Sequence, residues 1–191
     1  MIPTNMQNAM KRISQIQKNI QSFMKPFSKA NNKNTVKKGN FKQIINNRMN
    51  VNNNTNITAA DKNSPAAKYD KIIKQASEKY GLPQSLIKAV IKVESNFNTR
   101  AVSKAGAMGL MQIMPVNFKN LGIKDPFNAE QNVMAGTRFL KELFNRFRDM
   151  DKALAAYNAG PNRVSKYGIP FKVKRNYVDL VNKYLKQYGG K

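Results

Sequence analysis

The sequence contains no cysteine and no histidine, and only 10 of its 191 residues are acidic. Without cysteine there can be no disulfide and no thiolate metal site. Without histidine the commonest general base and the commonest metal ligand are missing, which excludes Ser-His and Cys-His nucleophilic mechanisms. Any acid–base chemistry must therefore use Asp, Glu, Lys or Tyr, and we expect neither a metal nor a cofactor.

Because 34 residues are Lys or Arg, the shortage of acids leaves a net charge of +24. Such a charge predicts attraction to polyanions, which include nucleic acid, an anionic membrane surface and an acidic cell wall. No apolar run approaches the roughly 18–20 residues that span a bilayer. The N-terminus also has no apolar stretch of about 7–15 residues, as a secretory signal peptide would require.

The composition divides the chain into three regions. Residues 1–24 predict an amphipathic helical arm, because apolar residues recur on one helical face at Ala9, Ile13, Ile16, Ile20 and Phe23. Docking on its own domain or a partner, contact with a membrane surface, and disorder all remain open for this arm. Residues 25–65 are rich in Asn and Lys and poor in apolar residues, which predicts a disordered linker. Residues 66–191 have the composition of a globular domain.

Helical periodicity dominates this third region, and no stretch shows convincing strand alternation. The apolar spacing predicts helices over about 69–80, 83–96, 128–147, 153–158 and 171–188. Gly81 is expected to end the first helix, and Pro83 to lie in the first turn of the second. Asn128 with Gln131 predicts a capping box at the start of the third. The domain is therefore expected to be mostly α-helical.

The second helix carries a carboxylate on its apolar face. Glu94 projects about 20° from Ile87 and about 40° from Val90 around the helix axis. Burial of a carboxyl group raises its pKa, and a carboxylic acid that stays protonated near neutral pH can act as a general acid. The alternatives are a buried Glu satisfied by a hydrogen bond, or a Glu at a frayed helix end.

A glycine-containing stretch follows and leads into a mostly apolar run, Leu110 to Pro115. Gln112 stands alone in this run as an amide among apolar residues, so its side chain needs hydrogen-bond partners. The hydroxyl and acetamido groups of a sugar could supply them. The methionines of the run are equally compatible with adaptable core packing.

Together these residues resemble the lytic transglycosylases of the soluble-lytic (SLT) type, in the lysozyme-like superfamily that includes goose-type lysozymes. The resemblance covers about residues 68–188 and rests on three stretches in the family's order and spacing: Glu94-Ser95-Asn96-Phe97-Asn98 with Ala101-Val102-Ser103, Gly106-Ala107 with Gly109-Leu110-Met111-Gln112-Ile113-Met114-Pro115, and Ala153-Leu154-Ala155-Ala156-Tyr157-Asn158-Ala159-Gly160-Pro161. It implies a mostly α-helical, lysozyme-like domain with a substrate cleft, preceded here by a helical or disordered arm.

The resemblance also implies an activity. It is cleavage of the β-1,4 bond between N-acetylmuramic acid and N-acetylglucosamine in peptidoglycan, giving 1,6-anhydromuramoyl ends. Glu94 matches the catalytic acid, which would then act as the base. The residues that match positions in contact with the glycan or near the cleavage point are Ser103, Gln112, Met114 and Asn158. Tyr157 matches the residue beside the catalytic Glu. A core Tyr with its hydroxyl paired is the alternative for Tyr157.

One departure from the family pattern concerns the last helix. Many relatives carry a Glu-Thr pair where this chain has Val173-Lys174. The acid of that pair contributes to the glycan cleft in the relatives that have it. No role is therefore carried over to Tyr177, which follows in the same segment.

The sequence is also compatible with other functions. Ordinary glycosidases use two carboxylates, and no acid lies between Glu94 and Asp125, which favours an intramolecular nucleophile. A lysozyme-type hydrolase on the same fold is one alternative. A wall-binding assembly component with weak activity is another. Specific nucleic-acid binding is disfavoured, because aromatic residues are not interleaved with the basic runs.

The expected substrate sets the expected location and partners. Peptidoglycan lies outside the cytoplasmic membrane, so we expect action in the periplasm or cell wall, although no signal peptide is recognisable. Residues 1–65 are the candidate contact for a flagellar, secretion or phage-tail machine, and they could also touch a membrane surface.

Overall fold

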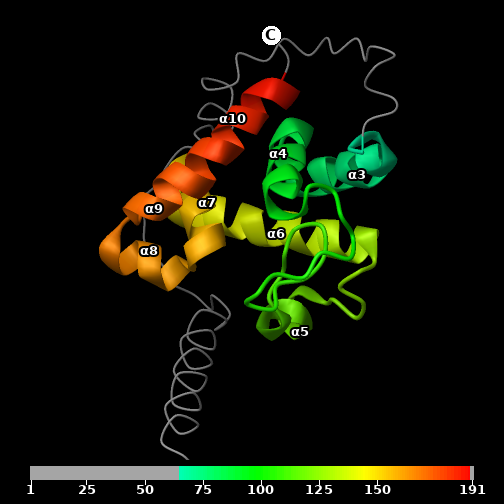
Figure 1. The fold of residues 1–191 in the computed structure, drawn as a ribbon, viewed down its shortest axis with the longest axis horizontal. Coiled ribbons are helices and arrows are strands. Elements are labelled where there is room, and N and C mark those ends of the chain that lie inside the picture. The colour runs from blue at the N-terminus through cyan, green and yellow to red at the C-terminus, as the bar shows by residue number, and fades with distance from the viewer. Residues whose placement is uncertain (1–64, 190–191) are drawn as a thin grey trace, which may run out of the picture. The chain divides into compact units, whose positions relative to one another are not determined.

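The computed structural model describes residues 65–189, and most of them lie in helices (Figure 1). The arm predicted at 1–24 and nearly all of the linker predicted at 25–65 lie outside the described residues. The helices are η2 (Ala67–Tyr69), α3 (Asp70–Tyr80), α4 (Gln84–Ser95), η3 (Pro115–Asn117), α5 (Phe118–Leu121), α6 (Ala129–Phe147), α7 (Met150–Ala159), α8 (Pro161–Tyr167), α9 (Phe171–Val173), η4 (Lys174–Val178) and α10 (Asp179–Tyr188). The expectation of a mostly α-helical domain is confirmed.

Helix α4 has a deeply buried face. Five of its residues are completely or almost completely inaccessible to solvent: Leu86, Ile87, Ala89, Val90 and Ile91. It packs against both α3 and α10 and lies between them in Figure 1. Because helix α4 is fixed on two sides, the residues at its C-terminal end are held in a defined place.

The ends of the first helices follow the sequence signals closely. Gly81 takes a left-handed conformation with φ of 64°, and its N–H donates to the Ser77 carbonyl at 2.8 Å, which ends α3 as predicted. Pro83 was expected inside the first turn of the next helix. It lies one position earlier, as the extended residue that precedes α4.

Helix α6 begins at the predicted capping residue, but the capping box is only half formed. Asn128 Oδ1 accepts a hydrogen bond from the Gln131 backbone N–H at 3.0 Å. The Gln131 side chain does not return the bond. Its Oε1 accepts instead from the backbone N–H groups of Lys124 and Asp125, at 2.9 and 3.1 Å. It therefore holds the preceding loop against the helix.

The C-terminal part differs most from the prediction. A single helix was expected over 171–188, but its first half contains a π-helical turn, η4, between α9 and α10. Helix α7 is longer than expected, because Asp149 caps it by accepting from the Lys152 N–H at 2.8 Å. Helix α8 was not predicted. Among residues 65–189 no helix is both long and apolar enough to cross a membrane.

Candidate active site

The carboxylate of Glu94 lies one residue before the end of α4 and is half-buried. The hydroxyl of Tyr177, on the π-helical turn η4, donates a hydrogen bond to Glu94 Oε1 at 2.6 Å. Tyr177 is itself buried, with 5% of its surface exposed. Helix α4 and η4 are far apart in sequence, so packing of the C-terminal segment creates this pair.

The surroundings of Glu94 change its acidity. Burial raises the pKa of Glu94 from 4.5 to about 7, and the hydrogen bond from Tyr177 opposes that rise because it stabilises the charged form. A carboxyl with a pKa near 7 is populated in both forms at neutral pH. It can therefore give a proton in one step and accept one in the next.

A second tyrosine shares this environment. Burial raises the pKa of Tyr157 well above its usual value, and the nearby Glu94 charge raises it further. The Tyr157 hydroxyl donates to the backbone carbonyl of Met111 at 2.8 Å, and its ring packs on Phe139 at 5.4 Å between centroids. Tyr157 thus lies close to Glu94, with its hydroxyl paired to the loop backbone.

The backbone just after Glu94 is unusual. Asn96 and Phe97 both have positive φ, 51° and 65°, a conformation that is rare for a bulky residue such as Phe. The Phe97 ring stacks on Tyr69 and meets Tyr188 edge-on. Ser95 Oγ donates to the Leu110 carbonyl at 2.8 Å. These contacts hold the end of α4 and tie it to the following loop.

That loop is folded back on itself around Met108. Met108 and Ile113 exchange two backbone hydrogen bonds, each 3.0 Å long. Gln112, between them, has φ of 50°, and its Nε2 donates to the carbonyls of Ala101 and Gly109 at 3.1 and 2.9 Å. The loop itself therefore supplies hydrogen-bond partners for the Nε2 group of Gln112.

The remaining predicted site residues lie in three different places. Ser103 Oγ accepts from the Ala107 N–H at 3.0 Å and closes a turn of the loop. Met114, directly before η3, is 38% exposed. Asn158 is exposed near the end of α7. The contacts of the structure join Glu94 to Tyr177, and Tyr157 to the loop, while Ser103, Met114 and Asn158 have no direct contact with Glu94 in the described part of the chain.

Sequence reasoning missed Asn132, a fully buried polar residue on α6. Its Oδ1 accepts from the Met111 N–H at 2.7 Å, and its Nδ2 donates to the carbonyls of Met108 and Pro126 at 3.0 and 2.9 Å. One side chain therefore holds two points of the loop and ties them to the segment that precedes α6. An Asn inside a predicted helix gives no signal of such a role, because its partners are distant in sequence.

The gathered groups consist of one carboxyl and two tyrosines, and no cluster in residues 65–189 has the three acidic, His or Cys side chains a metal site would need. The family model described as Transglycosylase SLT domain matches residues 71–176, more than half of the chain. This chain belongs to the SLT transglycosylase family.

Relatives and solved structures agree with the SLT assignment. A transglycosylase of Enterobacteria phage PRD1 is 38% identical over 102 residues, which cover 53% of this chain and 38% of the phage protein. The membrane-bound lytic murein transglycosylase F of Desulfosudis oleivorans is 36% identical over 104 residues, or 51% of this chain and 23% of that protein. This SLT protein thus spans less than half the length of the curated relatives it matches.

Two crystal structures share the fold. Lytic transglycosylase Slt of Pseudomonas aeruginosa, solved as an inactive mutant, superposes with a TM-score of 0.58 and 31% identity, over 62% of this chain and 23% of Slt. The 70 kDa soluble lytic transglycosylase of Escherichia coli gives 0.56 and 30%, over 64% of this chain and 25% of that enzyme. The predicted lysozyme-like SLT fold is confirmed.

Proposed function

We propose that this protein cleaves the β-1,4 bond between N-acetylmuramic acid and N-acetylglucosamine in peptidoglycan, leaving a 1,6-anhydromuramoyl end. The observation that carries the proposal is Glu94, whose pKa is raised to about 7 beside the hydroxyl of Tyr177. The SLT family membership and the lytic murein transglycosylases among its relatives support the choice of substrate.

The reaction needs one carboxyl group acting twice. Glu94 first gives its proton to the glycosidic oxygen, and the bond between that oxygen and C1 of the muramoyl residue breaks. The substrate's own N-acetyl oxygen stabilises C1. The Glu94 carboxylate then takes the proton of the C6 hydroxyl, whose oxygen bonds to C1 and closes the anhydro ring. A pKa near 7 suits both steps at neutral pH.

The roles of the other site residues belong to the same proposal. Tyr177 stabilises the carboxylate form of Glu94 after the first proton transfer. Tyr157 and Gln112 hold the loop beside the end of α4. Ser103, Gln112, Met114 and Asn158 contact the glycan. Their side chains are exposed or half-buried, as glycan contacts require.

Digestion of purified peptidoglycan, followed by mass spectrometry of the products, tests the reaction. We expect anhydromuramoyl ends from the wild type, and a loss of about 100-fold or more in rate for Glu94→Gln, because the amide cannot give or take the proton. Glu78→Gln, an exposed change on α3, is the matched control and is expected to keep wild-type activity. Reducing muramic acid ends would identify a hydrolase, and full activity in Glu94→Gln would remove Glu94 from the mechanism.

We also propose that residues 1–65 bring this activity to a wall-opening machine in the periplasm or cell wall. The support is their composition, with 11 Lys and Arg against one acid, Asp61, and the phage transglycosylase among the relatives. Deleting residues 1–65 is expected to preserve digestion of purified sacculi while abolishing localisation of a fluorescent fusion. Loss of activity on sacculi would instead make the arm part of the catalytic unit.

A further inference from the structure

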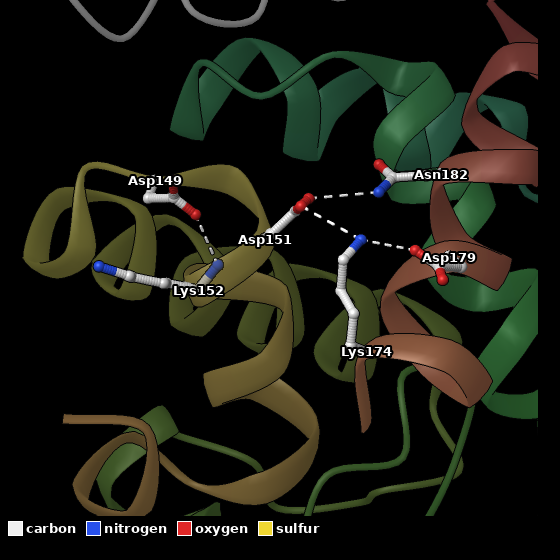
Figure 2. A network of polar contacts seen from close by, with 6 residues as sticks. All are labelled: Asp149, Asp151, Lys152, Lys174, Asp179 and Asn182. Atoms are coloured by element: carbon white, nitrogen blue, oxygen red, sulfur yellow. Dashed lines mark hydrogen bonds and ion pairs between the residues drawn. The ribbon is translucent and has the colours of Figure 1, made fainter. Parts of the chain in front are cut away.

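An ion-pair network surrounds Lys174, the first residue of the π-helical turn η4. Lys174 Nζ lies 2.5 Å from Asp179 Oδ1 and 3.3 Å from Asp151 Oδ2. Asn182 Nδ2 donates to the other oxygen of Asp151 at 3.3 Å. Figure 2 shows the Lys174 side chain extending between the two carboxylates. The network joins three elements: α7 through Asp151, η4 through Lys174, and α10 through Asp179 and Asn182.

The network acts on the turn that carries Tyr177. Lys174 is the first residue of the π-helical turn η4, and Tyr177 lies three positions later in the same turn. This turn packs against both α7 and α10. A π-helical turn inside a helix is an irregular segment that recurs at functional sites. Its position relative to α4 decides whether the Tyr177 hydroxyl reaches Glu94.

The exposure of these groups indicates what the network can do. The side chains of Lys174, Asp151 and Asp179 are 39%, 19% and 51% exposed. Ion pairs this exposed contribute little to overall stability, so the fold does not depend on them. Two carboxylates held by one ammonium group can still fix the orientation of a five-residue turn, because that requires far less energy than holding a domain together.

We propose that Lys174 is a positioning residue, which bridges Asp151 and Asp179 and thereby fixes η4 so that Tyr177 donates to Glu94. Its importance for catalysis rests on the proposed function, but the positioning itself is a property of the protein without substrate. A cation at position 174 thus ties η4 to both α7 and α10.

The titration of Glu94 reports this positioning directly. The full-length chain contains four glutamates, so carbon-13 labelling of glutamate carboxyl groups gives four NMR titration curves, and Glu94→Gln identifies one. Tyr177→Phe is expected to raise the pKa of Glu94 by about 0.5–1, because the lost hydrogen bond had stabilised the carboxylate. Lys174→Met is expected to raise the pKa of Glu94 by a smaller amount, because the turn that carries Tyr177 is no longer fixed.

Loss of a positive charge alone would also raise the pKa of a nearby carboxyl group. Lys172→Met is the matched control, because Lys172 is an exposed lysine two residues earlier in the same segment. In an otherwise wild-type chain, we expect Lys174→Met to raise the pKa of Glu94 by more than Lys172→Met does. In a chain that also carries Tyr177→Phe, we expect the two substitutions to raise it equally. Lys174→Arg, which can keep both ion pairs, is expected to leave the titration nearly unchanged.

Equal shifts for Lys174→Met and Lys172→Met would overturn the proposal, as would a Lys174→Met effect that persists in full with Tyr177→Phe. If Lys174→Met fails to fold, Asp151→Asn tests the same bridge from its other side. No substrate enters the titration, so a failure of the proposed reaction would show only in the digestion experiment and leave this result standing.

Discussion

Two opposing influences set the pKa of the Glu94 carboxyl group. Burial favours the protonated form, and the hydroxyl of Tyr177 favours the charged form. Neither influence alone gives an acid suited to two proton transfers, since strong burial would stop it ionising and strong hydrogen bonding would keep it ionised. Their balance brings its pKa to about 7.

This balance affects stability as well as chemistry. Because the folded-state pKa of Glu94 is raised, the folded protein holds this proton more tightly than the unfolded chain does. The resulting stability is present below about pH 4.5 and is lost as the pH rises towards 7. In Glu94→Gln the loss does not occur, so the variant should gain about 2–3 kcal/mol relative to wild type between these pH values.

Urea unfolding of both proteins across pH 4–8 measures this gain. Glu78→Gln, at an exposed position, should track the wild type throughout. A difference between Glu94→Gln and wild type that stays constant with pH would mean that the Glu94 pKa is the same in the folded and unfolded states.

At the scale of elements, local signals in the sequence located the helices whose ends are determined by their own residues. Gly81 and Asn128 act within one turn of the backbone they cap, so their effect can be deduced from the neighbouring sequence. The π-helical turn at Lys174–Val178 could not be deduced, because the apolar spacing over 171–188 also fits a continuous helix. The role of Asn132 and the contact between Tyr177 and Glu94 depend on residues distant in sequence.

The loop between α4 and η3 depends on close approach of Gly109 to α6. A Cβ at Gly109 would lie 2.3 Å from both Asn132 Nδ2 and the Pro126 carbonyl. Gly122 has a similar positive φ, 75° against 80°, but a Cβ there would meet nothing within 4 Å. An alanine at either position would therefore strain the backbone to a similar degree, and only the alanine at position 109 would also clash with neighbouring atoms.

We expect Gly122→Ala to cost about 1–2 kcal/mol of unfolding free energy, from backbone strain alone. Gly109→Ala should cost at least about 2 kcal/mol more, because the loop must move away from Asn132. Urea unfolding measures both. Equal losses would show that the loop accommodates a methyl group without disturbing the hydrogen bonds of Asn132.

For the molecule as a whole, the net charge of +24 follows directly from the sequence, but it says least about which partner the protein binds. It predicts affinity for any polyanion, and the SLT family membership is what favours peptidoglycan, whose peptide stems and attached polymers carry carboxylates and phosphates. Under the proposed function, the charge acts on encounter with the wall, while the site around Glu94 acts on the bond that is cut.

Salt separates these two contributions. Retention of Glu94→Gln on purified sacculi, which it should not digest, is expected to fall steeply between about 0.05 and 0.5 M NaCl, because the screening length shortens to a few ångströms. Sucrose at equal osmolarity is the control for effects of solute alone. Retention that does not change with salt would show that neutral contacts with the glycan dominate binding.

The π-helical turn has a consequence for the tolerance of this region to insertions and deletions. A π-helical turn holds one residue more than the α-helical turn it replaces, so deleting a single residue within 174–178 could restore a regular helix without loss of backbone hydrogen bonds. Because one full turn would replace another, the flanking segments would keep their relative orientation, and only the side chains inside the turn would change direction. Tyr177 would then turn away from Glu94 although no contact residue had been replaced. The number of residues between α9 and α10 is therefore as strict a requirement as the identity of the tyrosine.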